Sequence, residues 1–304
     1  MRYYLGIDGG GTQTTAWLAD GRRRVIARAQ AGPSNPAKVG MAGAQAEIER
    51  ALKGCLLHAG AARRSLAAVC AGVAGVDRAG VHDPLLRWLE ESVPAAHHAV
   101  TTDAAIALEA AFGEKPGILV ISGTGSIAYG RNPAGVIMRC GGWGSVFDDA
   151  GSGYDVGRKA VTGALWDFDG RGRHTRLGSL LCTALKLKVI TGVVELAPQP
   201  HEVAALISVV FRAARQGDRV ARMLCHEAGG ALADLASALH RRLSPGTAKL
   251  PVVCAGGVFR SSVLVRRSFA VHLRAKIPQA RITLLRRQPV EGALALARRL
   301  DSEA

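Results

Sequence analysis

The stretch "YYLGIDGGGTQTTAWLADGRRRVIA", residues 3–27, consists of two apolar runs on either side of a glycine-rich tip. The first run ends in Asp8, three glycines and a threonine follow, and the second run leads to an Asp-Gly turn. Two β-favouring runs around a short glycine segment are typical of a β-hairpin. The sequence therefore predicts a hairpin with a carboxylate at the end of its first strand.

The glycine-rich tip has two interpretations. It can be only a turn. It is not a Walker loop, because no Gly-Lys-Ser/Thr follows, and it is not a dinucleotide fingerprint, because a strand comes next. The alternative is a phosphate-binding loop, with Asp8 holding Mg²⁺ directly or through water. The tip residues that offer a backbone N–H or a hydroxyl to phosphate are Gly9, Gly10, Gly11, Thr12 and Thr14.

The hairpin has a second copy that begins at Ile118, "ILVISGTGSIAYGRNPAGVIMRCGGWG". An apolar strand, a short loop, a second strand, a turn and a third strand follow in the same order, which indicates a duplicated domain. The loop residues of this copy are Gly123, Thr124, Gly125 and Ser126. They offer the same donors without the carboxylate, so two such loops facing each other across a cleft would hold a polyphosphate from both sides.

Strands and helices alternate after each hairpin, which is typical of α/β domains with mixed sheets. Helices are predicted at 44–62, 82–93, 201–216, 219–243, 261–276 and from Pro289, and strands at 66–75, 97–103, 250–259 and 281–285. We place the domain boundary in "GEKPG", residues 113–117, which gives domains of 1–113 and 114–288.

Two of the later strand ends carry candidate site residues. Asp103 closes the strand "HHAVTTD", and a helix follows at once. The strand in "VVCAGGVF" ends at Ala255, Gly256 and Gly257, where glycine would let a flat group lie against the backbone. Open α/β sheets bind ligands at such strand ends. A tight strand-to-helix turn is the alternative for the glycines.

The composition fits a globular protein of two domains. The chain has 304 residues, with 48% hydrophobic and 21% charged residues. The six cysteines lie far apart and form no C-x-x-C pair, so they predict buried thiols and neither a zinc site nor a disulfide framework. The apolar stretch before Asp8 is too short for a signal peptide and no run is long enough for a membrane span. We therefore expect a soluble cytoplasmic protein.

The net charge of +15 raises the question of a nucleic-acid partner. The basic residues are scattered, however, and only 5% of residues are aromatic. A solvated, arginine-rich surface that attracts anionic small molecules such as nucleotides is the favoured interpretation. No nucleic-acid or membrane partner is expected. The sequence leaves the oligomeric state open, and a homodimer is compatible with it.

The ordered set of "DGGGT", Asp103, "GTGS", "GGWG…DDAGSG" and "AGGV" resembles the sugar kinase and actin-like ATPase superfamily. Within it, the chain is most similar to the N-acetylglucosamine kinase branch of the BadF/BadG/BcrA/BcrD ATPase family. The resemblance covers nearly the whole chain. It implies two ribonuclease-H-like domains with an active-site cleft between them, and a C-terminal helix, 289–304, that returns to the first domain.

The resemblance also implies ATP and Mg²⁺ as cofactors. The first phosphate loop would be Gly9 to Thr12, with Asp8 toward the metal, and the second would be Gly123 to Ser126. The segment from Ala255 would lie by the adenosine. Asp103 matches the aspartate that takes the proton from the sugar hydroxyl. Its other candidate role, capping the helix that starts at Ala104, is compatible with that chemistry.

For the sugar, the resemblance implies contacts from Asn35, Thr124, Trp143 and Asp149. Amide and carboxylate groups suit sugar hydroxyls, and an aromatic face suits a pyranose ring or an acetamido methyl. Trp143 has the alternative of a core residue, and Asn35, which precedes Pro36, that of a turn former. The chain departs from the family pattern at Ala150, where the branch usually has a glutamate. The nearby Asp148 is a candidate replacement for that charge.

The predicted function is an ATP-dependent amino-sugar kinase that phosphorylates the 6-hydroxyl of N-acetylglucosamine. Glucosamine is an alternative substrate. A second alternative is an ATPase activator of a 2-hydroxyacyl-CoA dehydratase or benzoyl-CoA reductase system, which would need cluster-ligating cysteines. Cys140 and Cys182 are the only plausible pair, and no cluster motif surrounds them. A non-catalytic sugar sensor is a third alternative, although Asp103 and both loops are intact.

Overall fold

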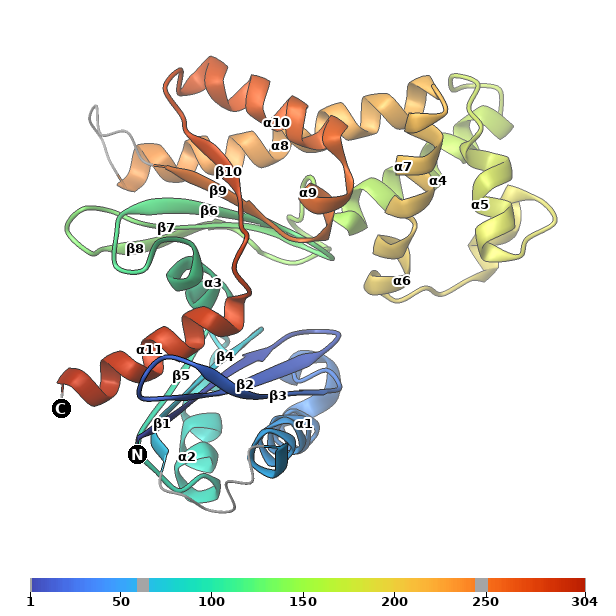
Figure 1. Ribbon diagram of the computed structural model, residues 1–304. Helices are drawn as coiled ribbons and strands as arrows, with labels where there is room; N and C mark the ends of the chain where they lie inside the picture. Colours follow the sequence, from blue (N-terminus) through green and yellow to red (C-terminus); the bar gives the residue numbers. More distant parts are fainter. Residues whose placement is uncertain (1, 59–65, 244–250, 304) are drawn as a thin grey trace. The chain divides into compact units, whose positions relative to one another are not determined.

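The computed structural model describes residues 2–58, 66–243 and 251–303. The chain divides into two compact units (Figure 1). Unit 1 consists of Met1–Lys115 and Arg286–Ala304, and unit 2 of Pro116–Leu285. Each unit is built on one five-stranded sheet.

The sheet of unit 1 has the order β3-β2-β1-β4-β5. Its strands are β1 (Tyr3–Gly9), β2 (Thr14–Asp20), β3 (Val25–Ala31), β4 (Leu66–Val73) and β5 (Ala95–Thr101). The first three form an antiparallel meander, and β4 and β5 run parallel to β1. The ends of β1, β4 and β5 therefore meet at one edge of the sheet.

Helices cover both faces of this sheet. They are α1 (Pro36–His58), α2 (His82–Ser92), α3 (Asp103–Phe112) and α11 (Pro289–Glu303). Leu5 and Ile7 of β1 pack on one face with residues of α1 and α2, and Tyr4 packs on the other face with residues of α3 and α11. A Cβ on Gly292 would lie 1.9 Å from the carbonyl oxygen of Ile106, so α11 packs backbone against backbone on α3. Figure 1 shows α11 beside the elements of unit 1.

Unit 2 repeats the plan of unit 1. Its strands are β6 (Gly117–Ser122), β7 (Ser126–Arg131), β8 (Ile137–Gly141), β9 (Val252–Ala255) and β10 (Ile282–Leu284). The order β10-β9-β6-β7-β8 again combines an antiparallel meander with two parallel strands. The predicted duplicated α/β fold with mixed sheets is confirmed.

The helices of unit 2 pack with β6, β7 and β9 in one large hydrophobic cluster of the described residues. They are α4 (Gly153–Phe168), α5 (Leu177–Leu185), the 3₁₀ helix η1 (Ile190–Glu195), α6 (Pro200–Ala205), α7 (Ile207–Arg215), α8 (Arg219–Leu243), α9 (Gly257–Ser261) and α10 (Val263–Lys276). Phe259 and Phe269 meet edge to face in this core, with ring centroids 5.2 Å apart.

Several predicted helices differ from the observed ones. The helix predicted at 44–62 begins earlier, at Pro36, and its residues 59–62 lie outside the described part of the chain. The helix predicted at 201–216 is two helices, α6 and α7. The helix predicted at 261–276 begins two residues later, at Val263, where Ser262 caps α10, and the short helix α9 precedes it. Helix α4 was not predicted. Its start lies within the glycine-rich segment 141–157, where Ser152 caps it by accepting from Asp155 N.

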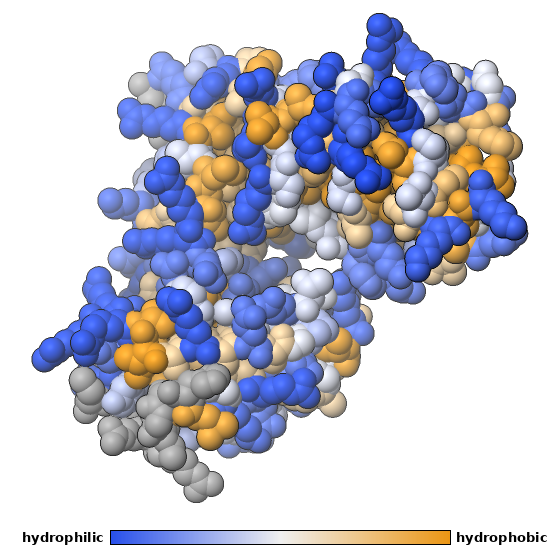
Figure 2. All heavy atoms as spheres, turned by 45° about the vertical axis from the view of Figure 1, so that its right-hand side comes forward, coloured by the Kyte–Doolittle hydropathy of each residue, from blue (hydrophilic) through white to orange (hydrophobic). Residues whose placement is uncertain are grey.

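The surface in Figure 2 carries widely spread hydrophilic side chains, and its hydrophobic side chains form several separate groups. Within residues 2–58, 66–243 and 251–303, no helix combines the length and the apolar composition that crossing a membrane requires.

Candidate active site

The glycine tip of unit 1 forms a tight loop between β1 and β2. Gly10 N donates to Gln13 O (2.9 Å), and Gly10 O accepts from Ser34 N (3.0 Å). Thr12 is exposed at this tip, whereas Thr14 is buried. The Thr14 hydroxyl oxygen lies 2.7 Å from Gly32 O and 2.8 Å from Ser34 Oγ. The Thr14 hydroxyl thus ties the base of the hairpin to the segment after β3, and Thr12 is the hydroxyl at the tip.

Two carboxylates lie where strands of unit 1 end. Asp8 is the penultimate residue of β1, and Asp103 follows β5 by two residues. Burial, and then the charge of Asp103, raise the pKa of Asp8 from 3.8 to about 7. Burial is also the main cause that raises the pKa of Asp103, opposed by the hydrogen bond from Ala104 N. Asp8 and Asp103 are therefore close enough to interact electrostatically, in surroundings that disfavour their charged forms.

The predicted capping role of Asp103 is wrong. Helix α3 begins at Asp103 itself, and its cap is Thr102, whose Oγ1 accepts from Ala105 N (3.0 Å). Asp103 Oδ1 instead accepts from Ala104 N (2.9 Å). A helix start with Thr and Asp in succession offers two capping residues, and the backbone conformation of Thr102 decides between them.

The structure adds two residues to this region that the sequence analysis missed. Asp77 lies in the turn after β4, and its charge contributes to raising the pKa of Asp103. Lys38 Nζ donates to Gly11 O (3.2 Å), which brings an ammonium group to the glycine loop. The position of Asp77 just beyond a buried strand was a usable signal, because β1, β4 and β5 end at the same edge.

Asn35 lies at the same edge of unit 1. Its Oδ1 accepts from Ala37 N (2.9 Å) at the start of α1. A Cβ on Gly75 would be 2.9 Å from this Oδ1, so Asn35 is packed against the turn that carries Asp77. Asn35 therefore acts as a turn former, which was the alternative given for it. Its amide also lies at the strand ends where the other candidate residues of unit 1 lie.

The second glycine loop, between β6 and β7, is bonded to the start of α4. Gly123 N donates to Gly125 O (2.9 Å), and Gly123 O accepts from Gly153 N (2.8 Å). Thr124 is exposed at the tip and Ser126 is buried, which repeats the pattern of Thr12 and Thr14. Ser126 Oγ donates to Ala150 O (2.9 Å), and Ser126 N donates to an oxygen of Asp149 (3.1 Å).

The Ala255–Gly257 turn lies beside this second loop. Gly256 has φ of 95°, and a Cβ there would lie 2.0 Å from Ser122 O at the end of β6. Only glycine fits this left-handed, closely packed position. A Cβ on Gly257 would meet no atom within 4 Å. The packing of β9 against β6 therefore requires glycine at position 256, and the space beside Gly257 is open.

Two of the three sugar candidates of unit 2, Asp149 and Trp143, differ in exposure. Asp149 is partly buried, and burial is the main cause that raises its pKa, with further contributions from Asp148 and Asp155. Trp143 is 63% exposed, and the Arg139 guanidinium lies 4.5 Å from its ring centroid. The core alternative for Trp143 is therefore wrong.

No group of three or more His, Cys, Asp or Glu side chains arranged to hold a metal occurs in the described ranges. Mg²⁺ does not require one, because it is commonly bound by one or two carboxylates together with phosphate oxygens and water. The oxygen donors of Asp8 fit that kind of site.

A model of the BadF/BadG/BcrA/BcrD ATPase family matches residues 5–297. The chain belongs to this family. Membership in an ATPase family implies that this BadF/BadG/BcrA/BcrD ATPase uses ATP.

Three relatives show how close the similarity is. The chain is 33% identical to an N-acetylmuramic acid/N-acetylglucosamine kinase of Clostridium acetobutylicum, covering 98% of this chain and 99% of the relative. It is 30% identical to an N-acetyl-D-glucosamine kinase of Dictyostelium discoideum, with 97% of each chain covered. A solved structure from Chromobacterium violaceum, described as a candidate N-acetylglucosamine kinase, superposes with a TM-score of 0.82 at 28% identity, covering 97% of this chain and 99% of that one.

Proposed function

We propose that this protein is an ATP-dependent amino-sugar kinase that transfers the γ-phosphoryl group to the 6-hydroxyl of N-acetylglucosamine. The proposal rests on the position and the raised pKa of Asp103. This carboxylate lies just after the end of a strand, in the unit that also contains the Gly9–Thr12 loop. A raised pKa makes a carboxylate a better proton acceptor near neutral pH. The two curated relatives named above support the sugar assignment. Because ATP is the donor, we expect the reaction to take place in the cytoplasm.

In the proposed mechanism, Asp103 accepts a hydrogen bond from the sugar 6-hydroxyl and takes its proton. The hydroxyl oxygen forms a bond to the γ-phosphorus as the bond from that phosphorus to the bridging oxygen breaks, and ADP leaves. Phosphoryl transfer needs positioning and charge stabilisation more than covalent catalysis. Asp8 would hold Mg²⁺, which neutralises phosphate charge when bound.

Phosphate binding is assigned to the tip hydroxyls of Thr12 and Thr124 and to backbone N–H groups of the two glycine loops other than those of Gly10 and Gly123, which donate within their loops. The hydroxyls of Thr14 and Ser126 already have partners within their units. Their proposed contribution is therefore to hold the loops in shape. Lys38, bonded to Gly11 O, adds a cation that suits phosphate oxygens.

The reaction is tested by incubating the protein with ATP, Mg²⁺ and a panel of N-acetylglucosamine, N-acetylmuramic acid, glucosamine and glucose. ADP release is followed by a coupled assay and the phosphorylated carbon is identified by ³¹P and ¹³C NMR. We expect a 6-phosphate of an N-acetylated amino sugar. ATP hydrolysis without any phosphosugar, or sugar binding without turnover, would contradict the proposal.

We expect Gly123→Val to weaken ATP binding at least about tenfold, a loss of about 1.4 kcal/mol. A Cβ on Gly123 would meet no protein atom within 4 Å, so the fold tolerates it and the side chain occupies the space of the ligand. Substitution of Gly10 would also disturb the loop itself, because a Cβ there would lie 3.1 Å from Gln13 O. Calorimetric titration with ATP measures the effect.

Gly178→Val is the matched control for Gly123→Val. Gly178 lies in α5, and a Cβ there also meets no atom within 4 Å. ATP affinity should be unchanged in this control. If Gly123→Val binds ATP as tightly as the control does, the second loop does not contact phosphate.

We expect Trp143→Ala to raise the KM for the sugar about tenfold while the KM for ATP changes less than about twofold, as loss of an aromatic contact of about 1 kcal/mol or more implies. The 63% exposure of Trp143 makes a loss of stability small. Trp166→Ala is the control, because Trp166 is also exposed, at 46%, and also lies under a guanidinium, that of Arg171. Equal effects of the two variants on the sugar KM would argue against a sugar contact at Trp143.

A further inference from the structure

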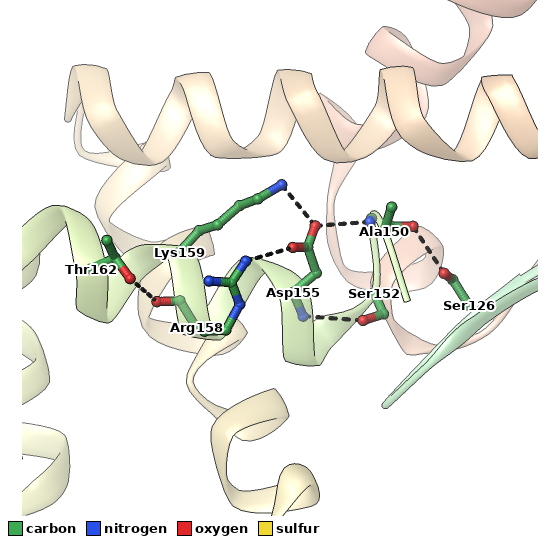
Figure 3. A network of polar contacts seen from close by, with 8 residues as sticks. Ser126, Ala150, Ser152, Asp155, Arg158, Lys159 and Thr162 are labelled. Carbon is green, nitrogen blue, oxygen red and sulfur yellow. Dashed lines mark hydrogen bonds and ion pairs between the residues drawn. The ribbon is translucent and has the colours of Figure 1, made fainter. Parts of the chain in front are cut away.

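A buried carboxylate in the first turn of α4 has no role in the mechanism above. Asp155 is 9% exposed, and its Oδ2 accepts from Gly151 N (3.0 Å) and from Lys159 Nζ (2.9 Å). Arg158 Nη2 lies 3.6 Å from the other oxygen. Figure 3 shows the carboxylate between these two basic side chains and the segment that precedes α4.

The segment 149–152, which carries Asp149, is held by side chains from outside it. Ser126 Oγ donates to Ala150 O, and Ser122 Oγ donates to Gly151 O (2.9 Å each). Ser126 N donates to Asp149 Oδ1 (3.1 Å). All three of these bonds come from the ends of β6 and β7, which flank the second glycine loop.

Asp155 supplies the bond from the opposite side. Gly151 thus has its N–H bonded to Asp155 and its carbonyl bonded to Ser122. Gly151 also has φ of 77°, and a Cβ there would lie 2.7 Å from Ala228 O, so only glycine fits this closely packed position beside α8. A buried N–H without an acceptor is costly, so the Asp155 bond adds to the three bonds from β6 and β7 by satisfying the Gly151 N–H.

The charge of Asp155 is compensated within unit 2. Lys159 is four residues further along α4 and Arg158 is three, so both lie on the helix face that Asp155 occupies. A buried carboxylate that is bonded to a backbone N–H and paired with two cations is suited to hold structure and not to transfer a proton. Ala150, which stands where the resemblance implies glutamate, contributes only its carbonyl oxygen to these contacts.

We propose that Asp155 is a positioning residue for sugar binding: by accepting from Gly151 N, it sets the conformation of the segment 149–152 and with it the place of the Asp149 carboxylate. The inference rests on the proposed function, because Asp149 is assigned to the sugar there. It adds a residue that touches neither ATP nor sugar, yet determines the affinity for one of them.

The test uses Asp155→Ala, which removes the acceptor for Gly151 N. We expect the KM for N-acetylglucosamine to rise at least about tenfold, while the dissociation constant for ATP changes less than about twofold. Amide hydrogen exchange of the segment 149–152, measured by mass spectrometry without substrate, should become at least about tenfold faster. The double variant Asp155→Asn/Lys159→Met keeps an oxygen acceptor and removes the unpaired ammonium, and should restore both quantities to within about threefold of wild type.

Asp167→Ala is the matched control on the same helix. Asp167 Oδ2 accepts from Thr175 N (2.9 Å) near the other end of α4, so its removal also deprives a backbone N–H of a carboxylate. This control should lose stability without raising the sugar KM. A tenfold rise in both variants would mean that Asp155 acts only through the stability of unit 2, and would overturn the inference.

Exchange and KM both unchanged in Asp155→Ala, with an active wild type, would likewise overturn the inference and leave the proposed function standing. A wild type that phosphorylates no amino sugar would overturn the proposed function, and with it the assignment of the segment to sugar. The exchange measurement separates these cases, because it needs no substrate.

Discussion

Replacing Asp103 by asparagine should reduce kcat for sugar phosphorylation by about 10²- to 10⁴-fold, the usual contribution of a general base. Asparagine retains the oxygen that accepts from Ala104 N (2.9 Å), and Thr102 caps α3 independently of residue 103. The fold should therefore survive. Affinity for ATP should also survive, because the change removes a proton acceptor and not a phosphate ligand. Steady-state kinetics with a calorimetric ATP titration measure both.

Asp83→Asn is the matched control for this variant. Asp83 also lies in the first turn of a helix of unit 1, α2, and its side chain is 82% exposed. Its loss should leave kcat within about twofold of wild type. If Asp103→Asn turns over within about threefold of wild type, a change under about 0.7 kcal/mol, the base lies elsewhere and Asp149 becomes the next candidate.

Asp8→Asn should make the metal-free protein more stable at neutral pH while abolishing Mg²⁺-dependent turnover. The folded protein holds the Asp8 proton up to about pH 7, whereas an unfolded chain releases it near 3.8. Between these values the folded state binds more protons, so the stability of wild type falls as pH rises from about 4 to about 7. Asparagine does not titrate and escapes this loss, which is at most about 4 kcal/mol for a shift of about three units.

Urea unfolding in EDTA at pH 4.5 and at pH 8 measures the difference. Asp8→Asn and wild type should be close at pH 4.5, and the variant should be more stable at pH 8 by about 1 to 4 kcal/mol. Adding Mg²⁺ with ATP should stabilise wild type more than the variant, because ligands that bind the folded state stabilise it. A stability difference that does not change between the two pH values would show that Asp8 is not held in surroundings that disfavour its charge.

The carboxylates assigned to the reaction and the carboxylate assigned to positioning should affect stability in opposite directions. Asp8 and Asp103 are both held where burial disfavours their charge, and both are assigned to the reaction. Groups placed for function commonly cost stability in this way. The Asp155 carboxylate differs, because Lys159 and Arg158 balance its charge, and its loss should weaken the structure around it.

The sequence by itself determined the repeated hairpins, the two glycine loops and the candidate residues at strand ends. These features depend on local rules: alternating apolar residues form strands, and glycines between them form tips. The repetition of the plan at Ile118 then predicted a duplicated fold, and the two five-stranded sheets confirm it.

Only the tertiary structure decided which side chains meet. Parallel pairing of β1 with β4 and of β4 with β5 joins segments tens of residues apart and brings Asp77 close enough to Asp103 to affect its pKa. Burial decided that Thr14 and Ser126 face inward while Thr12 and Thr124 stay at the tips. The contacts of Asp155 could likewise not be predicted, because the glycine-rich segment 141–157 has no helical periodicity that marks the start of α4. Local patterns describe a strand or a loop, whereas the partners of a side chain depend on packing between distant parts of the chain.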